Sequence, residues 1–299
     1  MTIAEPGGPT LGAVAALGSA LTWALIGLVA RALIPYFNVL SINMIRSAVG
    51  GVLLAVVVLA SGSLGALGAV SPTSWVYLTV SVITAFAIGD TAFFESTKTI
   101  GLARAMSLSM LYPLLASALG FWFLGERITP FVAAGAVVTL GGLVLIVGER
   151  APVTSEAPDG RSRGLALALL AALAFAVSVA LTKPVLHEVD PVSVQAVRLP
   201  LAAVLLWLTP WARGAGRQVR AHLRAAGPLL LLHGVLTAIS AVTFVTALKY
   251  ADLALATVLS STSPLFALPI GFLVFGERAT WRAVLGVLLC VGGIALLSL

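Results

Sequence analysis

The sequence places one carboxylate and two guanidinium groups inside long apolar stretches, where ionised side chains are rare. Asp90 lies in AFAIGDTAFFES, and Arg46 and Arg198 each lie about eight residues into an apolar run, roughly 12 Å along a helix. A charge in such a run usually marks a substrate path, a proton relay or an internal ion pair. Asp90 is therefore expected to bind a solute or carry a coupling proton, or else to be neutralised by Arg46 or Arg31 or hydrated near a water interface.

Hydroxyl groups in two further apolar runs could line a solute site. Ser109 and Tyr112 are three residues apart, as are Ser260 and Ser263, so each pair shares a helix face. A proline follows Tyr112 and Ser263 directly; within a helix it frees a carbonyl group that can face a cavity. The competing interpretation is close helix packing, in which serine is common.

Three aromatic residues are further candidates for the solute site. Trp23 lies about a dozen residues into the first apolar run, too deep for the aromatic belt at a membrane surface. Phe94 follows Asp90 by one helical turn, and Phe244 lies in the eighth run. Each could form an apolar wall beside a substrate, or could simply pack in the protein core.

Composition identifies the solvent around these groups as partly lipid. Of 299 residues, 60% are apolar and 9% charged, whereas a soluble domain carries about 25% charged residues. The net charge of +6 is scattered between apolar runs and forms no basic face, so we expect no nucleic-acid partner. Cys290 is the single cysteine, which excludes an intrachain disulfide and a Cys-rich metal site. The sequence predicts no metal and no cofactor.

Ten stretches approach the length of about 20 apolar residues that a helix needs to cross the hydrocarbon core. They are 11–33, 39–60, 75–97, 103–124, 130–148, 164–183, 191–211, 227–249, 252–275 and 281–299. We expect the first to be a retained helix, because no basic segment precedes it and no cleavage signal stands out. The predicted fold class is an all-α integral membrane protein with ten transmembrane helices.

An internal repeat relates the two halves of the chain. With a shift of 151 residues, PLLASALGFWFLGER (113–127) aligns with PLFALPIGFLVFGER (264–278), and eight of fifteen positions are identical. Upstream, a shift of 152 pairs Arg46 with Arg198, so the alignment needs one gap. We predict a first repeat at 1–150, a linker at 151–163 and a second repeat at 164–299.

Each predicted repeat holds an odd number of spans, so the two copies must cross the membrane in opposite directions. Inverted repeats of this kind place a site near mid-depth at their interface and suit alternating access. Both repeats keep the arginine, which favours a structural role for Arg46 and Arg198, at a headgroup or at helix carbonyls, over binding of an anionic substrate. Asp90 aligns with Ala241, and this asymmetry favours substrate binding or proton coupling.

With its ten spans and two repeats, the sequence resembles the drug/metabolite transporter superfamily, and within it the EamA-type ten-span transporters. Besides Trp23, Arg46 and Asp90, the resemblance is carried by GLARA (101–105), by Tyr112-Pro113, and by the Gly-Glu-Arg turns at 125–127 and 276–278. It covers essentially the whole chain. It implies export or exchange of small metabolites, such as amino acids, without ATP hydrolysis. The turns themselves are expected to be structural hairpins with their charges at the water interface.

Two arguments predict opposite orientations of the chain in the membrane. Connectors after odd-numbered spans contain twelve basic residues and those after even-numbered spans contain three, so the positive-inside rule places both termini outside the cell. The resemblance implies cytoplasmic termini. The basic segment 213–224 is in either case a natural partner for anionic lipid headgroups.

The sequence therefore predicts a secondary active transporter in the plasma membrane, as a monomer or homodimer, with a small-molecule substrate and membrane lipids as partners. Spans 1, 3, 4, 6, 8 and 9 would supply the cavity, and protonation of Asp90 could couple efflux to the proton gradient. The alternatives are a flippase of a lipid-linked substrate or a multidrug efflux carrier. An enzyme is not expected, since no nucleophile–base motif and no GxxxxGK[ST] loop occurs. A channel would need a filter motif or charged ring, and none is seen.

Overall fold

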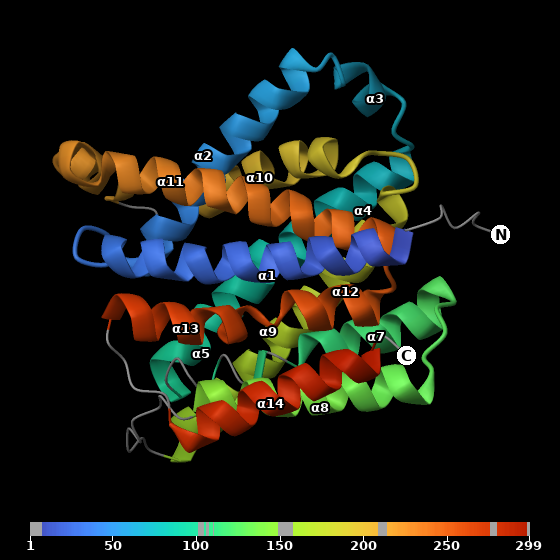
Figure 1. Ribbon diagram of the computed structural model, residues 1–299. Helices are drawn as coiled ribbons and strands as arrows, with labels where there is room; N and C mark the ends of the chain where they lie inside the picture. The colour runs from blue at the N-terminus through green and yellow to red at the C-terminus, as the bar shows by residue number, and fades with distance from the viewer. Residues whose placement is uncertain are drawn as a thin grey trace.

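The computed structural model is helical throughout the residues that it describes, which are 8–100, 105, 108–109, 111–148, 158–208, 214–275 and 280–297. The elements (Figure 1) are α1 (Gly8–Leu33), α2 (Val39–Ala60), α3 (Leu64–Gly68), α4 (Pro72–Val82), the π-helix η1 (Ile83–Asp90), α5 (Thr91–Ile100), α7 (Tyr112–Leu124), α8 (Pro130–Gly148), α9 (Pro158–Val185), α10 (Pro191–Trp207), α11 (Ala215–Tyr250), α12 (Leu253–Ser260), α13 (Ser263–Phe275) and α14 (Trp281–Leu297).

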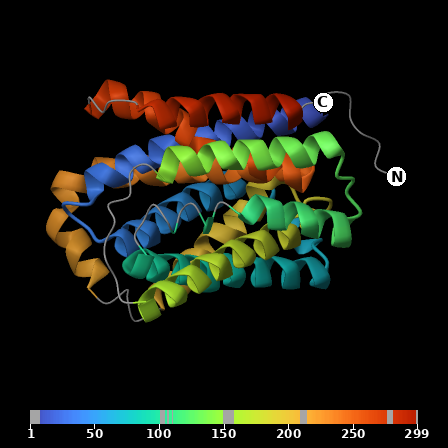
Figure 2. The same ribbon diagram turned by 90° about the horizontal axis from the view of Figure 1, so that it is seen from below.

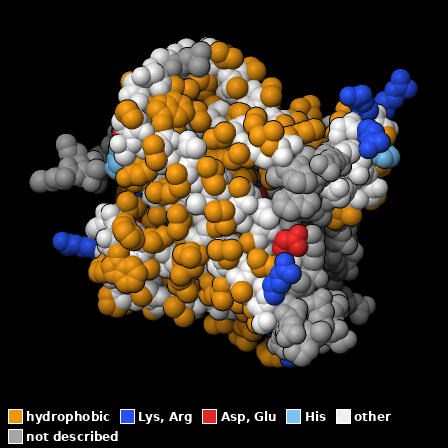
Figure 3. All heavy atoms as spheres, turned by 180° about the vertical axis from the view of Figure 1, so that it is seen from behind, with side chains coloured by type: hydrophobic (Ala, Val, Ile, Leu, Met, Phe, Trp, Pro, Cys, Tyr) orange, Lys and Arg blue, Asp and Glu red, His pale blue; other side chains and the backbone are white. Residues whose placement is uncertain are grey.

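Ten apolar helical segments lie within these residues. Five are long and apolar enough to cross a membrane by length and composition, namely Gly8–Ala30, Ser41–Ala60, Pro72–Phe93, Ser162–Val185 and Gly216–Tyr250. Five are shorter, namely Tyr112–Leu124, Pro130–Leu145, Pro191–Trp207, Leu253–Ala267 and Val284–Leu296. Apolar side chains cover much of the face shown in Figure 3, on which few charged side chains appear. The predicted class, an all-α membrane protein, is confirmed.

The helices run back and forth between two ends of the molecule. The start of α1 and the end of α14 lie at the same end, here called the terminus side; the opposite end, where α8 ends and α9 begins, is the linker side (Figures 1 and 2). Along α8 the chain runs away from the terminus side, whereas along its repeat equivalent α14 it runs towards it. The two repeats therefore point in opposite directions, as the odd number of spans in each requires.

Packing between helices is symmetric with respect to exchange of the repeats. The equivalent helices α2 and α10 pack together, as do α8 and α14, and the fourth and ninth spans meet through α7 and α12. The other main contacts come in related pairs, since α1 packs on α11 as α9 packs on α4, η1 and α5. This pattern is that of a pseudo-twofold axis, which the antiparallel directions place in the membrane plane.

Glycines bring α8 and α14 into backbone contact. A Cβ atom on Gly142 would lie 2.5 Å from the carbonyl oxygen of Gly286 and 2.8 Å from Cys290 Sγ. A Cβ atom on Gly293 would meet the equivalent place on the other helix, 2.8 Å from the carbonyl oxygen of Gly135. Membrane helices associate closely through such small residues because lipid provides no hydrophobic drive between them.

Side-chain caps and a glycine define several helix ends. Asp190 caps α10, accepting hydrogen bonds from the backbone N–H groups of Val192 and Ser193 at 2.9 and 3.0 Å. Ser71 likewise caps α4. Gly125 ends α7 with φ at 68°, the left-handed conformation expected of the Gly-Glu-Arg turn. The exposed Glu188 accepts hydrogen bonds from the Ser71 N–H and from the hydroxyls of Ser74 and Ser71, which lower the pKa of its carboxyl.

Four spans differ from their predicted form. The third widens into η1 instead of continuing as a regular α-helix, and the ninth is broken at Ser261 and Thr262 between α12 and α13. The prediction that α11 begins near 227 was wrong: it starts at Ala215 and includes most of the basic segment that was expected to be a loop. At about 1.5 Å per residue, its 36 residues span about 54 Å, well beyond the hydrocarbon core. Helix α9 similarly begins at Pro158, inside the predicted linker.

Two Gly-Gly pairs permit a matched test of the α8–α14 contact. The second glycine of each pair, Gly142 or Gly293, is crowded, whereas Gly141 and Gly292 have no neighbouring atom within 4 Å of a built Cβ. We expect Gly142→Ala and Gly293→Ala each to cost about 1–3 kcal/mol of stability through overpacking. Gly141→Ala and Gly292→Ala should be neutral or slightly stabilising in thermal unfolding of the purified protein. Equal effects within a pair would contradict this packing.

Candidate functional site

Asp90 belongs to a polar cluster formed by three spans. Asn43 Nδ2 on α2 donates a hydrogen bond to Asp90 Oδ2 at 3.0 Å, and Arg46, one turn further along α2, donates from Nε to Asn43 Oδ1. The Arg46 guanidinium carbon lies 4.9 Å from the centre of the Trp23 ring on α1, a cation–π arrangement. Asn43 thus bridges the carboxylate and the guanidinium, and Arg46 acts electrostatically on Asp90.

The backbone around Asp90 is unusual, because Asp90 is the last residue of η1. A π-helix has one extra residue per turn, and such segments recur at functional sites. Here the segment brings Gly89 against Phe175 of α9, and a Cβ atom on Gly89 would lie 2.7 Å from Phe175 Cε1. The absence of a side chain at Gly89 lets α9 approach the residue next to the carboxylate.

The cluster is only partly covered by protein. Trp23 is 45% exposed, although it lies in the middle of α1, and both Arg46 and Asp90 are half-buried. A guanidinium facing lipid is costly, so we expect the open face of this cluster to meet water. On its inner side, His233 of α11 is within electrostatic range of Arg46 and is 1% exposed; neither ring nitrogen has a hydrogen-bond partner among the described residues.

Tyr112 joins the broken ninth span to this region. Its hydroxyl accepts a hydrogen bond from Ser261 Oγ at 3.2 Å and donates to the carbonyl oxygen of Thr257 at 3.5 Å. Its ring meets that of Phe175 edge-on, with centroids 6.4 Å apart. Phe175 in turn touches Gly89, so a continuous line of contacts leads from the helix break to the Asp90 cluster.

Arg198 occupies the position in α10 that Arg46 occupies in α2. Its Nη2 donates to Ser178 Oγ at 3.0 Å, and Ser178 Oγ donates to the carbonyl oxygen of Ser81 at 2.6 Å. One turn before it, Gln195 Nε2 donates to the carbonyl oxygen of Ala241 at 3.2 Å. Arg198 is therefore held inside the protein at the junction of α4, α9, α10 and α11, which argues against a lipid headgroup as its partner.

The remaining predicted site residues are less closely associated. Phe244 is half-buried and packs against the same apolar cluster as Tyr112. Ser260 ends α12 with a buried hydroxyl that has no partner among the described residues, and Ser263 begins α13, so the helix break removes the common face expected for this pair. Ser109 is half-buried in a short helical stretch, and the side chain of Phe94 lies outside the described residues.

Sequence inspection missed three residues of this region. Asn43, Gln195 and Phe175 are polar or aromatic residues inside apolar runs, and none carries a charge. The 152-residue shift could have found them, because it aligns Asn43 with Gln195 and Trp23 with Phe175.

A second charged cluster lies on the terminus side. Lys183, near the end of α9, forms an ion pair with Glu126 and donates to the carbonyl oxygen of Ala251 at 2.6 Å. Glu126 also accepts from the Leu253 N–H at 2.9 Å, which caps α12. The Glu126 side chain is 9% exposed, so the expectation that this turn's charges lie in water was wrong for Glu126.

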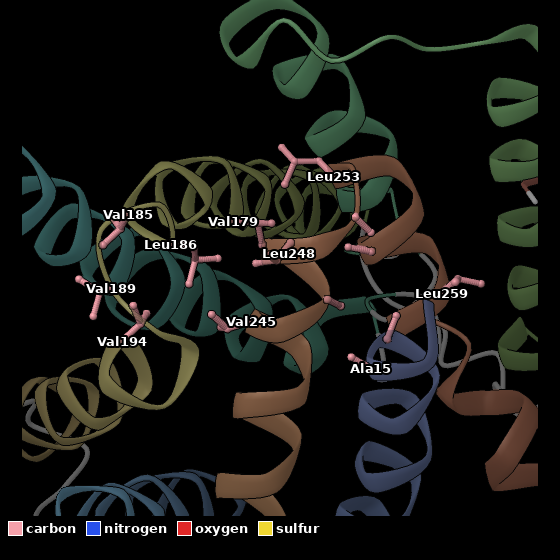
Figure 4. Close-up of a cluster of buried hydrophobic side chains, with 14 of the residues drawn as sticks. Ala15, Val179, Val185, Leu186, Val189, Val194, Val245, Leu248, Leu253 and Leu259 are labelled. Atoms are coloured by element: carbon pink, nitrogen blue, oxygen red, sulfur yellow. The ribbon is translucent and has the colours of Figure 1, made fainter. Parts of the chain in front are cut away.

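The largest apolar cluster of the described residues surrounds this ion pair. Figure 4 shows its side chains between the end of α9, the end of α11, α12 and the start of α1. Members include Ala15, Val185, Leu186, Val245, Leu248 and Leu253. Described clusters on the linker side are smaller, one joining α1, α2 and α11 and another joining α5 to α9. Apolar packing and an internal ion pair thus hold the helix ends together on the terminus side.

Two inverted helical repeats around internal charges form the architecture of a membrane transporter. Comparison with known proteins agrees with this class. The model of the EamA-like transporter family matches residues 10–148 and again residues 162–299. The chain belongs to this family.

A relative in Archaeoglobus fulgidus, described as an uncharacterized transporter, is 30% identical over 223 residues, which are 74% of this chain and 75% of that protein. A crystal structure of another protein superposes with a TM-score of 0.76 at 22% identity, covering 97% of this chain and 95% of the other. At that identity the likeness concerns the fold alone.

The contact between Gly89 and Phe175 can be tested by a compensating pair of substitutions. Gly89→Ala should lower stability by about 1–3 kcal/mol, because the new methyl group overlaps the Phe175 ring. Phe175→Leu should recover part of that loss in the double variant, as measured by thermal unfolding. Gly27→Ala, in open space on α1, is the control. Strict additivity of the two substitutions would show that the residues are not in contact.

Proposed function

We propose that this protein is a secondary carrier of the plasma membrane that exports or exchanges a small polar or amphipathic metabolite, such as an amino acid, by alternating access. The observation that carries the proposal is the half-buried carboxylate of Asp90, hydrogen-bonded by Asn43 and facing Arg46, at the interface of two inverted repeats. Intramembrane carboxylates in such positions mark ion or substrate pathways.

Asp90 is suited to couple transport to protons. In its ionised form it accepts the Asn43 amide and is paired electrostatically with Arg46. Taking up a proton removes its charge and so weakens its hold on Arg46, which the Trp23 ring still supports through its π face. A proton could therefore change how strongly α2 and η1 are held together, and so favour one conformation of the carrier.

The wall of the substrate chamber would come from aromatic and hydroxyl groups around this carboxylate. Trp23, Tyr112 and Phe244 supply apolar surface, and the ninth span is interrupted beside Tyr112, at Ser261 and Thr262 between α12 and α13. Discontinuous helices at a repeat interface are typical of substrate sites in carriers, because their free backbone groups bind polar solutes.

Replacing Asp90 tests the coupling. Asp90→Asn keeps a side chain of the same shape but cannot gain or lose a proton. We expect uptake of labelled amino acids driven by an imposed pH gradient to fall to background in proteoliposomes, while exchange without a gradient persists. Unchanged pH-dependent transport by this variant at several pH values would remove Asp90 from the coupling.

Closure of the terminus side can be tested through the ion pair that lies there. In a Cys290→Ser background, Val179→Cys places a thiol in the closed apolar cluster, one turn before Lys183. Glu126→Gln should raise its labelling rate by a membrane-impermeant maleimide about tenfold, the effect of about 1.4 kcal/mol on opening.

Glu188→Gln is the matched control for this experiment. Glu188 lies on the same side but binds Ser71 and Ser74 instead of Lys183, so its loss should change the labelling rate much less. Equal rates in both variants would show that the Glu126–Lys183 pair does not hold this side closed.

A further inference from the structure

Arg198 is a buried cation whose charge is not balanced. It is 7% exposed, its Nη2 is bound to the neutral Ser178 hydroxyl, and its Nε is buried without a partner among the described residues. Among the described residues, no carboxylate forms an ion pair with it. Removing an unpaired charge from water costs several kcal/mol, so such a group normally faces an anion.

The first repeat shows which anion this site lacks. Arg46, the equivalent of Arg198, is accompanied by the amide of Asn43 and by the carboxylate of Asp90. In the second repeat the amide is kept as Gln195, and it still contacts the position equivalent to Asp90. That position is Ala241, which carries no carboxylate and offers only its backbone oxygen to Gln195.

We propose that a carboxylate of the transported solute pairs with Arg198 beside Ala241, where the protein itself supplies none. The inference rests on the proposed carrier function and specifies the charge that its substrate bears. Ser178 fixes one edge of the guanidinium and leaves Nε for the incoming oxygen. Phe244 lies one turn beyond Ala241 on α11 and Phe175 one turn before Ser178 on α9, so apolar surface flanks the anion site.

Arg198 is covered in this structure, so the carboxylate reaches it only when the surrounding helices separate. The contacts that cover it join α9, α10 and α4 through Ser178 and Ser81. These helices belong to different repeats, since α4 lies in the first and α9 and α10 in the second. Movement of one repeat relative to the other, as alternating access requires, opens this junction.

Supplying the missing carboxylate from the protein tests the proposal. The new carboxylate of Ala241→Asp should occupy the anion site and so raise the melting temperature of the ligand-free protein relative to Ala241→Asn. It should also weaken binding of solute carboxylates at least about tenfold, or about 1.4 kcal/mol. The probes are a panel of L-amino acids, their carboxamides, butanoate and chloride, read by thermal shift and by uptake into proteoliposomes. Ala241→Asn adds the same bulk without charge, so the difference between the two variants isolates the charge.

The expected result is stabilisation of the parent protein by at least one carboxylate and not by its carboxamide, and loss of that difference in Ala241→Asp. Arg198→Gln should lose it as well, and this variant decides the matter where Ala241→Asp does not fold. Equal effects of carboxylate and carboxamide, or full replacement of the carboxylate by chloride, would overturn the proposal. Stabilisation by added phosphatidylglycerol alone would assign Arg198 to a lipid headgroup and overturn it too.

These outcomes separate the anion site from the carrier function. If Asp90-dependent uptake of a carboxamide proceeds and is insensitive to Ala241→Asp, the carrier function is supported and the anion site is contradicted. If no probe is transported by the parent protein and none shifts its melting temperature, the proposed function itself is contradicted.

Discussion

Close backbone contact between equivalent helices is the constraint on which the structure depends. Gly142 and Gly293 are each covered by the partner helix at a distance that leaves no room for a Cβ atom. Because equivalent glycines make the contact from both sides, each repeat contributes the same close approach to the interface. The axis fixed by α8 and α14 then dictates how the other spans meet, including α2 with α10 and the two interrupted spans.

The chemistry within this frame is not symmetric. Lipid offers no water to an internal charge, so each ionised side chain requires a partner from the protein or from a ligand. Arg46 has Asp90, and Lys183 has Glu126, but among the described residues Arg198 has only the hydroxyl group of Ser178. The second repeat therefore lacks the carboxylate that the first repeat places beside its arginine, and this is where the proposed solute carboxylate would bind.

Spans and repeats were predictable from the sequence because both are expressed over many residues. A run of about 20 apolar residues and an aligned block such as PLLASALGFWFLGER tolerate local exceptions. The π-helix and the break at Ser261 were not predictable in this way, since each depends on which carbonyl accepts which N–H, and average hydropathy is unchanged by that choice. The first turns of α11 were missed because they are polar, although they continue the helix into water.

The candidate site residues also differ in how well the sequence predicts them. Asp90 and the two arginines were found because a charge stands out in an apolar run, whereas Asn43 and Phe175 gain their importance from contacts with distant segments. Glu126 was assigned to water since it follows a helix-ending glycine, yet its partner Lys183 lies far along the chain. Only the folded chain brings these residues together.

For the proposed alternating access, the repeat offers a second conformation in which each repeat adopts the form that the other has here. Glu126 pairs with Lys183 in this structure, and the alignment matches these residues with Glu277 and Arg31. The sequence therefore supplies charges of the same signs for both conformations of the proposed carrier. Two conformations held by similar ion pairs would differ little in free energy, and a substrate or a proton worth a few kcal/mol would suffice to shift the population between them.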